Sequence, residues 1–285
     1  MKLMSYLRQG EASWGALESD DRVVDLKHVA PTLRAALEQF GIDGIRARLP
    51  QAEGGARLRL ADVSLLPVVP DPRKIVCIGL NYEAHRLEAK RAETRYPTLF
   101  PRWASSQAAH GADIPLPPES VQLDFEGEIA LVIGKSGRRI AKEDAWSHIA
   151  GYAPYNDASI RDWQYHTTQW GAGKNFDGTG AFGPWMVTRD EIEDGQRLEL
   201  VTRLNGNEVQ RGHTDQLIFS IPVLINYVST VMTLLPGDVI VTGTPAGVGV
   251  KREPPLFMKA GDRIEVEVIG VGRLENRVVS ETTAR

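Results

Sequence analysis

Short apolar segments rich in β-branched residues recur along the chain and predict a protein built mainly of strands. From residue 74 onward they are bounded by glycine, proline or polar turn residues, as strands usually are. We expect strands at 74–79, 126–134, 149–156, 183–188, 198–204, 238–243, 263–268 and 272–279. Ser220–Leu235 instead spaces its apolar residues for a helix. Asn205-Gly206 lies between two alternating segments and predicts a two-residue hairpin turn.

Residues 1–70 show a different pattern, which predicts a small separate domain. Short alternating segments predict strands at 3–8, 14–17 and 22–25. Pro31 and Gly41 bracket a predicted helix, and a second short helix is expected near 42–49. The proline-rich segment 63–72 is typical of a linker. We therefore expect an N-terminal α/β domain at 1–70 and a larger domain at 71–285.

The larger domain is predicted to be α+β and β-rich rather than a doubly wound α/β sheet, because strands outnumber helices. Within it, 81–95 has a composition compatible with a helix, whereas 96–122 carries five prolines and is predicted to be mostly loop with short strands.

The composition argues against several classes of function. The chain has 285 residues, a net charge of −4 and a pI of about 5.9. This charge gives no electrostatic case for binding nucleic acid or an anionic membrane. The single cysteine, Cys77, lies in a predicted strand and excludes an internal disulfide. No apolar segment has the length of a membrane span and no signal-peptide pattern is present, so we expect a cytoplasmic protein.

The most informative segment is Asp124-Phe125-Glu126-Gly127-Glu128. Side chains alternate along a strand, so Glu126 and Glu128 would point the same way, roughly 6.5–7 Å apart. Two such carboxylates repel each other unless a divalent cation, arginines or a shared proton offsets the repulsion. The alternative is a solvated strand edge whose acidic side chains face water.

Two further groups can complete a site, and each has an ordinary structural explanation. Asp157 follows a predicted strand, where side chains often face a cleft, but it would equally serve as the N-cap of a helix at 158–164. His85 and Glu88 are three residues apart and would share a helix face. A carboxylate beside an imidazole raises its basicity for activating water, although a solvated ion pair has the same spacing.

Two glycine-rich loops carry the remaining candidates. Lys174 lies between glycines, where its ammonium group can enter a site and stabilise negative charge, or remain in solvent. Thr244 lies in Gly243-Thr244-Pro245-Ala246-Gly247, whose amides and hydroxyl can hold a carboxylate. A tight structural turn explains the same residues.

Taken together and in this order, these pieces resemble the fumarylacetoacetate hydrolase family. The resemblance covers residues 74–279 and rests on the following motifs: Gly79-Leu80-Asn81-Tyr82-x-x-His85-x-x-Glu88, Asp124-Phe125-Glu126-x-Glu128, Asn156-Asp157-x-Ser159-x-Arg161-Asp162-x-Gln164, Lys174-x-Phe176-Asp177 and Gly243-Thr244-Pro245-x-Gly247. It implies a mixed β-sandwich roll of the family's C-terminal type, and a homodimer.

The resemblance also implies roles for individual residues. Glu126, Glu128 and Asp157 match the family's metal ligands. Asp124 is outside that set, and we expect it either to lie next to the ligands or to face solvent. Such an all-oxygen set suits Mg²⁺, with Mn²⁺ or Ca²⁺ as substitutes. His85 and Glu88 match the water-activating pair, and Lys174 the lysine that meets substrate oxygens. The remaining matches, to substrate-binding or neighbouring positions, are Arg161, Gln164 and Thr244.

One departure concerns substrate recognition. Many family members carry Lys-Pro after the position of Phe100, whereas this chain reads Pro101-Arg102-Trp103. Arg102 would replace the lysine's charge with a planar guanidinium, so we expect it to bind substrate with different geometry. Trp103, together with the nearby aromatic residues Tyr165, His166 and Trp170, predicts a larger or more aromatic substrate.

The expected activity is therefore metal-dependent hydrolysis of a C–C bond in a 1,3-diketo acid, such as an acylpyruvate or a ring-cleavage product. The main alternative is a decarboxylase, isomerase or hydratase of a 2-oxo acid that uses the same metal site. A glycosidase using the two glutamates is a further alternative, but such pairs usually come from different elements. A non-enzymatic module with a structural Ca²⁺ also remains open.

Overall fold

A large mixed sheet forms the centre of the molecule. The structure, a computed structural model, describes residues 1–49 and 55–282. The sheet's main path contains, in spatial order, β4 (Arg57–Arg59), β3 (Arg22–Asp25), β2 (Glu11–Ser19), β1 (Lys2–Arg8), β15 (Met186–Thr188), β12 (Ile149–Asn156), β11 (Gly127–Ile133), β18 (Val239–Val241), β6 (Ile75–Gly79) and β7 (Thr98–Arg102). Three short strands pair beside it: β5 (Ser64–Leu65), β8 (Gln107–Ala108) and β14 (Gly180–Phe182).

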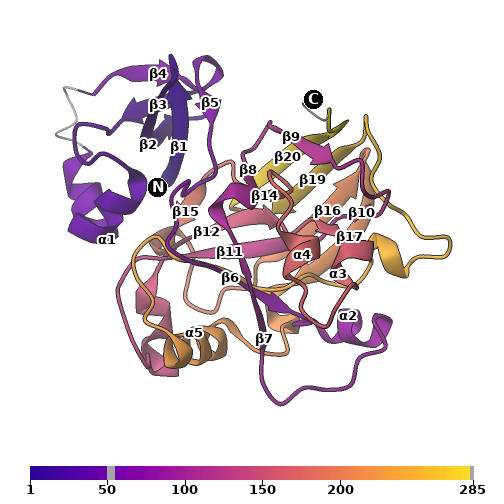
Figure 1. The fold of residues 1–285 in the computed structure, drawn as a ribbon. Coiled ribbons are helices and arrows are strands. Elements are labelled where there is room, and N and C mark those ends of the chain that lie inside the picture. Colours follow the sequence, from indigo (N-terminus) through magenta and orange to yellow (C-terminus); the bar gives the residue numbers. More distant parts are fainter. Residues whose placement is uncertain (50–54, 283–285) are drawn as a thin grey trace.

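A second sheet packs against the large one (Figure 1). It contains, in order, β17 (Asn207–His213), β16 (Glu199–Leu204), β19 (Arg263–Val268), β20 (Gly272–Ser280) and β9 (Asp113–Leu116). A separate pair joins β10 (Leu123–Asp124) to β13 (Ser159–Ile160). The helices are α1 (Leu33–Arg48), α2 (Glu83–Glu88), α3 (Arg161–Gln164), α4 (Gly171–Lys174) and α5 (Ile221–Val231).

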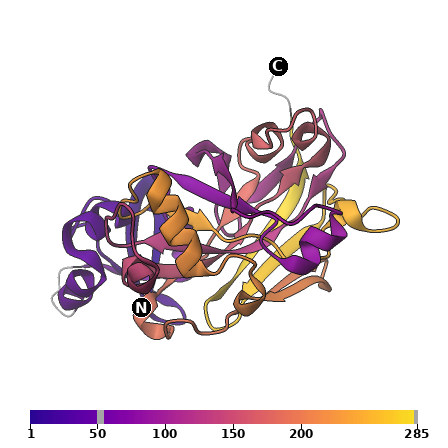
Figure 2. The same cartoon turned by 90° about the horizontal axis from the view of Figure 1, so that it is seen from below.

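Strand β11 is buried on both faces, which explains its continuous apolar sequence. Ile129, Leu131 and Ile133 contribute to the core between the two sheets. The alternate residues Ala130 and Val132 join the core on the other side, toward α1. From below, α5 (orange) crosses the large sheet, whereas α2 (purple) lies toward the five-stranded sheet (Figure 2). The expected α+β, strand-rich fold is confirmed.

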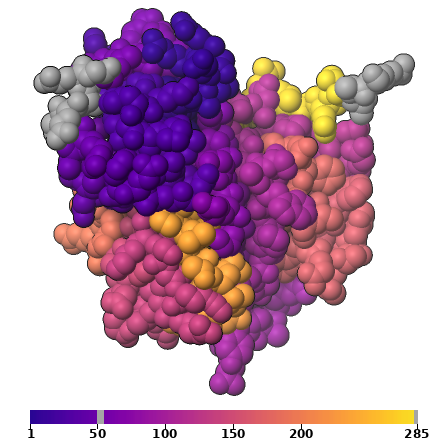
Figure 3. All heavy atoms as spheres, turned by 60° about the vertical axis from the view of Figure 1, so that its left-hand side comes forward, coloured from indigo at the N-terminus to yellow at the C-terminus, as the bar shows by residue number. Residues whose placement is uncertain are grey.

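The N-terminal strands continue the large sheet. Lys2 pairs with Val187 and Leu3 with Met186, so β1 extends the sheet directly from β15. In the space-filling view this part (indigo) forms a lobe that packs against the rest (Figure 3). The first strands thus share a sheet with the rest of the chain. The division into two domains at 1–70 and 71–285 stays a prediction.

Several predicted elements differ in their bounds. Helix α1 begins after the N-cap Thr32, so Pro31 precedes the cap instead of occupying the first turn. The helical path of α1 is interrupted at Gly41, where φ is 59°, which agrees with the two predicted helices on either side of this residue. Helix α2 is shorter than the 81–95 segment, whereas 96–122 contains the short strands β7, β8 and β9, as expected. No helix in the described ranges is both long and apolar enough to span a bilayer.

Five adjacent strands present the same end to one region of the surface. Strands β12 and β11 are antiparallel, β18 is antiparallel to β11, and β6 is parallel to β18. The end of β12, the start of β11 and the ends of β18 and β6 therefore meet, with the start of β7 beside them. Of the candidate residues from the sequence, Glu126, Glu128, Asp157 and Thr244 lie in or just beyond these strand ends.

Candidate metal centre and active site

Three buried carboxylates meet at this end of the sheet. Glu128 lies in β11, Glu126 immediately precedes that strand, and Asp157 follows β12. The strand pairing and a hydrogen bond of 2.8 Å from the Asp157 N–H to the Glu126 carbonyl hold the two segments together. One oxygen from each carboxylate lies within 4.8 Å of the others. Asp157 is therefore no helix N-cap, since α3 begins only at Arg161.

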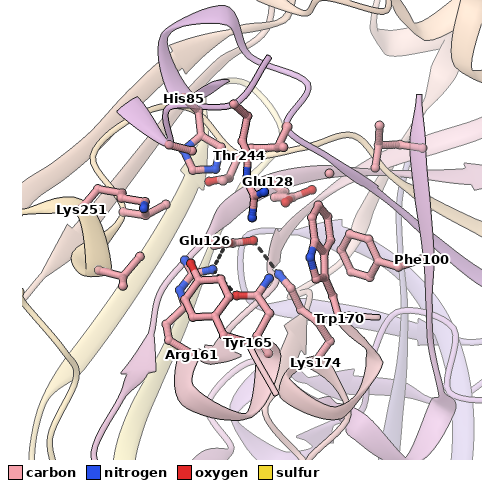
Figure 4. Close-up of a pocket in the computed structure, with 18 of the residues that line it drawn as sticks. His85, Phe100, Glu126, Glu128, Arg161, Tyr165, Trp170, Lys174, Thr244 and Lys251 are labelled. Carbon is pink, nitrogen blue, oxygen red and sulfur yellow. Dashed lines mark hydrogen bonds and ion pairs between the residues drawn. The ribbon is translucent and has the colours of Figure 1, made fainter. Parts of the chain in front are cut away.

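Two basic side chains neutralise part of this negative charge. Lys174 Nζ lies 2.7 Å from Glu126 Oε2 and 2.6 Å from Asp157 Oδ2. Arg161 Nη1 lies 2.7 Å from Glu126 Oε1. Burial alone raises the pKa of Glu126, but Lys174 and Arg161 outweigh it and lower the pKa to about 2. Figure 4 shows both bases beside Glu126 on the floor of a cavity.

Glu128 has no ion-pair partner within the described residues. Its Oε2 accepts a hydrogen bond of 2.6 Å from the backbone N–H of Gly243. Burial, together with the nearby carboxylates of Asp157 and Glu126, raises the pKa of Glu128 well above its usual value. Glu128 is therefore the carboxylate of the triad whose negative charge is not balanced by a basic side chain of the described residues. Three hard oxygen donors in this arrangement fit a divalent cation such as Mg²⁺, Mn²⁺ or Ca²⁺.

His85 faces the carboxylates from the opposite wall of the cavity (Figure 4). It lies on the short helix α2, and its Nδ1 is 3.1 Å from Glu88 Oε2, one helical turn away. Glu88 also accepts a hydrogen bond of 3.0 Å from the N–H of Gly247, which fixes the carboxylate. With Nδ1 held, Nε2 is the nitrogen left for a substrate, since no residue in the described ranges binds it.

Asn81 anchors the segment that carries His85, a role that we did not infer from the sequence. Its amide nitrogen donates to the carbonyls of Thr242, at 2.8 Å, and Phe219, at 3.1 Å. Its amide oxygen accepts from the N–H of Phe219 at 2.8 Å. The asparagine is visible in the motif, but these partners lie more than a hundred residues away.

Asp124 is buried and acts as a brace. Its carboxylate accepts from Arg161 Nε at 2.8 Å and from the N–H groups of Gly249 and Val250 at 2.7 and 2.9 Å. It therefore orients Arg161 and fixes the loop after β18. As expected, Asp124 lies outside the acidic triad, and of its two expected environments the solvent-facing one is wrong, because its exposure is 0%.

Replacing Asp124 by asparagine should lower the free energy of unfolding by about 3 kcal/mol, because the buried charge of Arg161 would lose one of its two carboxylate partners and keep only Glu126. Urea denaturation measures this loss. The matched control is Asp62→Asn, which breaks an exposed ion pair with Arg59 and should cost less than about 1 kcal/mol. Equal stability of the two variants would contradict the bracing role.

Gln164 and Thr244 both line the cavity. Gln164 accepts a hydrogen bond of 2.9 Å from Arg161 Nη1. The Thr244 hydroxyl donates to the carbonyl of Gly127 at 2.9 Å and accepts from Gln210 Nε2 at 2.8 Å. Gln210 also accepts from the N–H of Gly127, between the two glutamates, at 3.0 Å. Nothing in the sequence indicated this contribution from the distant hairpin.

Arg102 lies behind the triad and does not line the cavity. Its Nη1 is 2.6 Å from Asp157 Oδ1 and its Nη2 donates to the Thr179 hydroxyl at 2.9 Å. The side chain is buried. In place of the substrate contact expected from the sequence, we propose that Arg102 holds Asp157 in position.

The cavity is small, with a volume of about 270 Å³. Phe100 and Trp170 form an apolar wall, with ring centroids 5.5 Å apart. Tyr165 also lines the cavity, whereas Trp103 does not and is 59% exposed. Sites for drug-sized ligands usually measure about 300–1,000 Å³. The cavity therefore fits a small acid better than the larger aromatic substrate that these residues suggested.

Comparisons with known proteins agree with this architecture. Residues 74–279 match the model of the fumarylacetoacetate (FAA) hydrolase C-terminal family. A human mitochondrial oxaloacetate tautomerase is 40% identical over 264 residues, which is 90% of this chain and 84% of that protein. The solved fumarylacetoacetate hydrolase from Exiguobacterium antarcticum is 34% identical, with a TM-score of 0.86, and covers 99% of this chain and 100% of its own.

A third similar protein was solved with ligands. The maleylpyruvate hydrolase from a Sphingobium species, in complex with manganese(II) and pyruvate, is 30% identical to this chain. Its TM-score is 0.82, and the match covers 99% of this chain and 100% of that one.

Proposed function

The chain belongs to the fumarylacetoacetate hydrolase family, and on that premise we propose that it catalyses keto–enol tautomerisation of a small 2-oxo acid, with oxaloacetate as the first candidate substrate. The observation that carries the proposal is a single imidazole, His85, facing a triad of carboxylates across a small cavity. The activity named for the human relative supports this choice.

The site can hold the groups that tautomerisation requires. Glu126, Glu128 and Asp157 would hold a divalent cation, which would act as a Lewis acid and polarise the 2-oxo group. Arg161 Nη2 is buried and lacks a partner within the described residues, so it is placed to bind a substrate carboxylate. Lys174 lines the same cavity and would stabilise negative charge that develops on the 2-oxo oxygen.

His85 would move the proton. Its Nε2 takes a proton from C3, the C–H electrons form the C2–C3 double bond, and the carbonyl pair moves onto oxygen. The imidazolium then returns the proton to that oxygen, which gives the enol. Glu88 keeps Nδ1 protonated and stabilises the imidazolium while it exists. The reverse order of proton transfers converts enol to ketone.

Hydrolysis of an acylpyruvate is the second candidate, because the same His85–Glu88 pair can deprotonate water. The solved maleylpyruvate hydrolase supports this reading. The 2-oxo end would bind as before, and the water would attack the distal carbonyl. Cleavage of that carbonyl's bond to carbon would release an enolate and a carboxylic acid. Disappearance of acylpyruvates in a substrate panel separates this reaction from tautomerisation. The expected homodimer remains a prediction.

Removing the metal should abolish tautomerisation. We expect the purified protein to accelerate decay of the ultraviolet absorbance of enol-oxaloacetate, to lose this activity after treatment with EDTA, and to recover it with Mg²⁺ or Mn²⁺. The control is the same titration without protein, because metal ions catalyse the reaction in solution. Full activity after complete removal of the metal would contradict the proposed role of the triad.

A further inference from the structure

Three basic side chains at the mouth of the cavity take no part in the site described so far. Lys90 and Arg91 follow α2, and Lys251 lies in the loop after β18. All three line the cavity and are exposed. None forms an ion pair with any residue of the described ranges 1–49 and 55–282. We call Lys90, Arg91 and Lys251 the cationic rim.

The end of α2 fixes the backbone of the first two. The N–H of Arg91 donates to the Arg86 carbonyl and the N–H of Lys90 to the Leu87 carbonyl, both at 3.0 Å. These bonds form a Schellman motif, in which glycine usually occupies the left-handed position. Here Lys90 occupies it, with φ of 53°, a conformation that is unfavourable for residues with a Cβ atom. Lys90 therefore occupies a position where the backbone conformation favours glycine.

Lys251 is positioned through the acidic brace. Asp124 binds the N–H groups of Gly249 and Val250, the two residues before Lys251, as well as Arg161. Gly249 has no room for a side chain, because a Cβ atom would lie 1.8 Å from the Leu256 carbonyl oxygen. Asp124 thus connects the backbone next to Lys251 with Arg161, which contacts the acidic triad. Figure 4 shows Lys251 on the side of the cavity opposite Phe100 and Trp170.

The charges around the cavity favour an anion with two charged ends. Five basic residues line it against two acidic ones, although the whole chain has a net charge of −4. The basic residues are Lys90, Arg91, Arg161, Lys174 and Lys251, and the acidic residues are Glu126 and Glu128. Arg161 and Lys174 are paired with carboxylates at the floor, whereas the rim has no ion-pair partner in the part of the chain that the structure describes. A cation in the triad would add further positive charge.

We propose that the cationic rim binds a second carboxylate of the substrate, so that the preferred substrates are 2-oxo dicarboxylates. The 2-oxo acid end would lie at the triad and Arg161, and the far carboxylate at the rim. Residues of the triad and of the rim line the same small cavity, and Phe100 and Trp170 would lie beside the carbon chain of the substrate. This inference rests on the proposed function for the orientation of the substrate and extends it to substrate selection.

The test compares two acids that differ only at the far end. Oxaloacetate carries a carboxylate where 2-oxobutyrate carries a methyl group, and enzyme-catalysed exchange of the C3 protons in D2O reports on both by NMR. Combining Arg91→Ala with Lys251→Ala should lower kcat/KM for oxaloacetate about tenfold. The value for 2-oxobutyrate should stay within about twofold, and added salt should weaken the wild-type preference.

Lys259→Ala provides the matched control. It removes one charge from an exposed lysine that does not line the cavity, so it should leave the preference unchanged. An equal loss for both acids in the double variant would show a structural effect and overturn the proposal. An unchanged preference for oxaloacetate would overturn it as well.

A binding measurement separates failure of this inference from failure of the proposed function. N-oxalylglycine carries an oxalyl group and a far carboxylate, whereas oxamate carries a similar head without that carboxylate, and neither can enolise. In calorimetry with Mn²⁺, the wild-type protein should bind N-oxalylglycine more tightly, and the double variant should lose about tenfold of that preference. If no acid is turned over but this difference is found, only the proposed reaction fails. Equal binding of the two ligands by the wild-type protein would overturn the role of the rim.

Discussion

Replacing His85 by glutamine should lower kcat for tautomerisation by about 10²–10⁴-fold, because glutamine cannot accept a proton from carbon or return one to oxygen. The affinity for Mn²⁺ should not change, since His85 is not one of the three clustered carboxylates. Initial rates with enol-oxaloacetate measure the first effect, and calorimetry with the metal measures the second.

Two further variants sharpen this result. His28 is exposed and lies outside the cavity, so His28→Gln is the matched control and should keep full activity. Glu88→Gln should lose less than His85→Gln, because the imidazole remains but its Nδ1 loses a charged partner. Wild-type turnover by His85→Gln would remove this residue from the mechanism. Another group, or water, would then have to carry the proton.

Replacing Lys174 by methionine should destabilise the metal-free protein by about 3–5 kcal/mol, because Glu126 and Asp157 would lose the ammonium group that lies between them. These two carboxylates also raise the pKa of Lys174, although its burial favours the neutral amine, so the group is charged in the folded protein. Urea denaturation in EDTA measures the loss.

The response to metal distinguishes this effect from a simple packing defect. A divalent cation supplies positive charge to the same carboxylates, so it should restore more stability to Lys174→Met than it adds to the wild-type protein. Lys259→Met, at an exposed position, should match the wild-type protein in both conditions. If Lys174→Met were destabilised equally with and without metal, charge compensation by Lys174 would be excluded.

The sequence was sufficient to single out those candidate residues that lie in short, recognisable motifs. Glu126, Glu128, Asp157, His85 and Lys174 were singled out from short motifs, and the fold brings all of them together at one end of the sheet. Residue spacing also predicted the Asn205-Gly206 hairpin, where both residues adopt positive φ, at 53° and 79°. These features depend on neighbours within a few residues.

Contacts between distant segments were not predictable in the same way. Arg102 has the charge expected of a substrate ligand, but its position behind Asp157 depends on a contact between segments 55 residues apart in the chain. Gln210 reaches Gly127 from a different sheet, 83 residues away in the chain. The cationic rim was missed because the sequence does not show that the end of α2 and the loop after β18 face the same cavity.

The arrangement of strand ends separates two tasks that evolution can change independently. The carboxylates that would hold the metal lie in β11 or directly next to β11 and β12, two strands that are buried in the centre of the large sheet. The proposed proton carrier lies on a six-residue helix, and part of the rim lies in a loop whose backbone N–H groups are bound by Asp124. Substitutions in these outer segments can change which bond of a bound 2-oxo acid reacts, or which group accepts the proton. The carboxylates at β11 and β12 would stay unchanged. A single scaffold can thereby diversify among hydrolases, isomerases and tautomerases without rebuilding the step that they share.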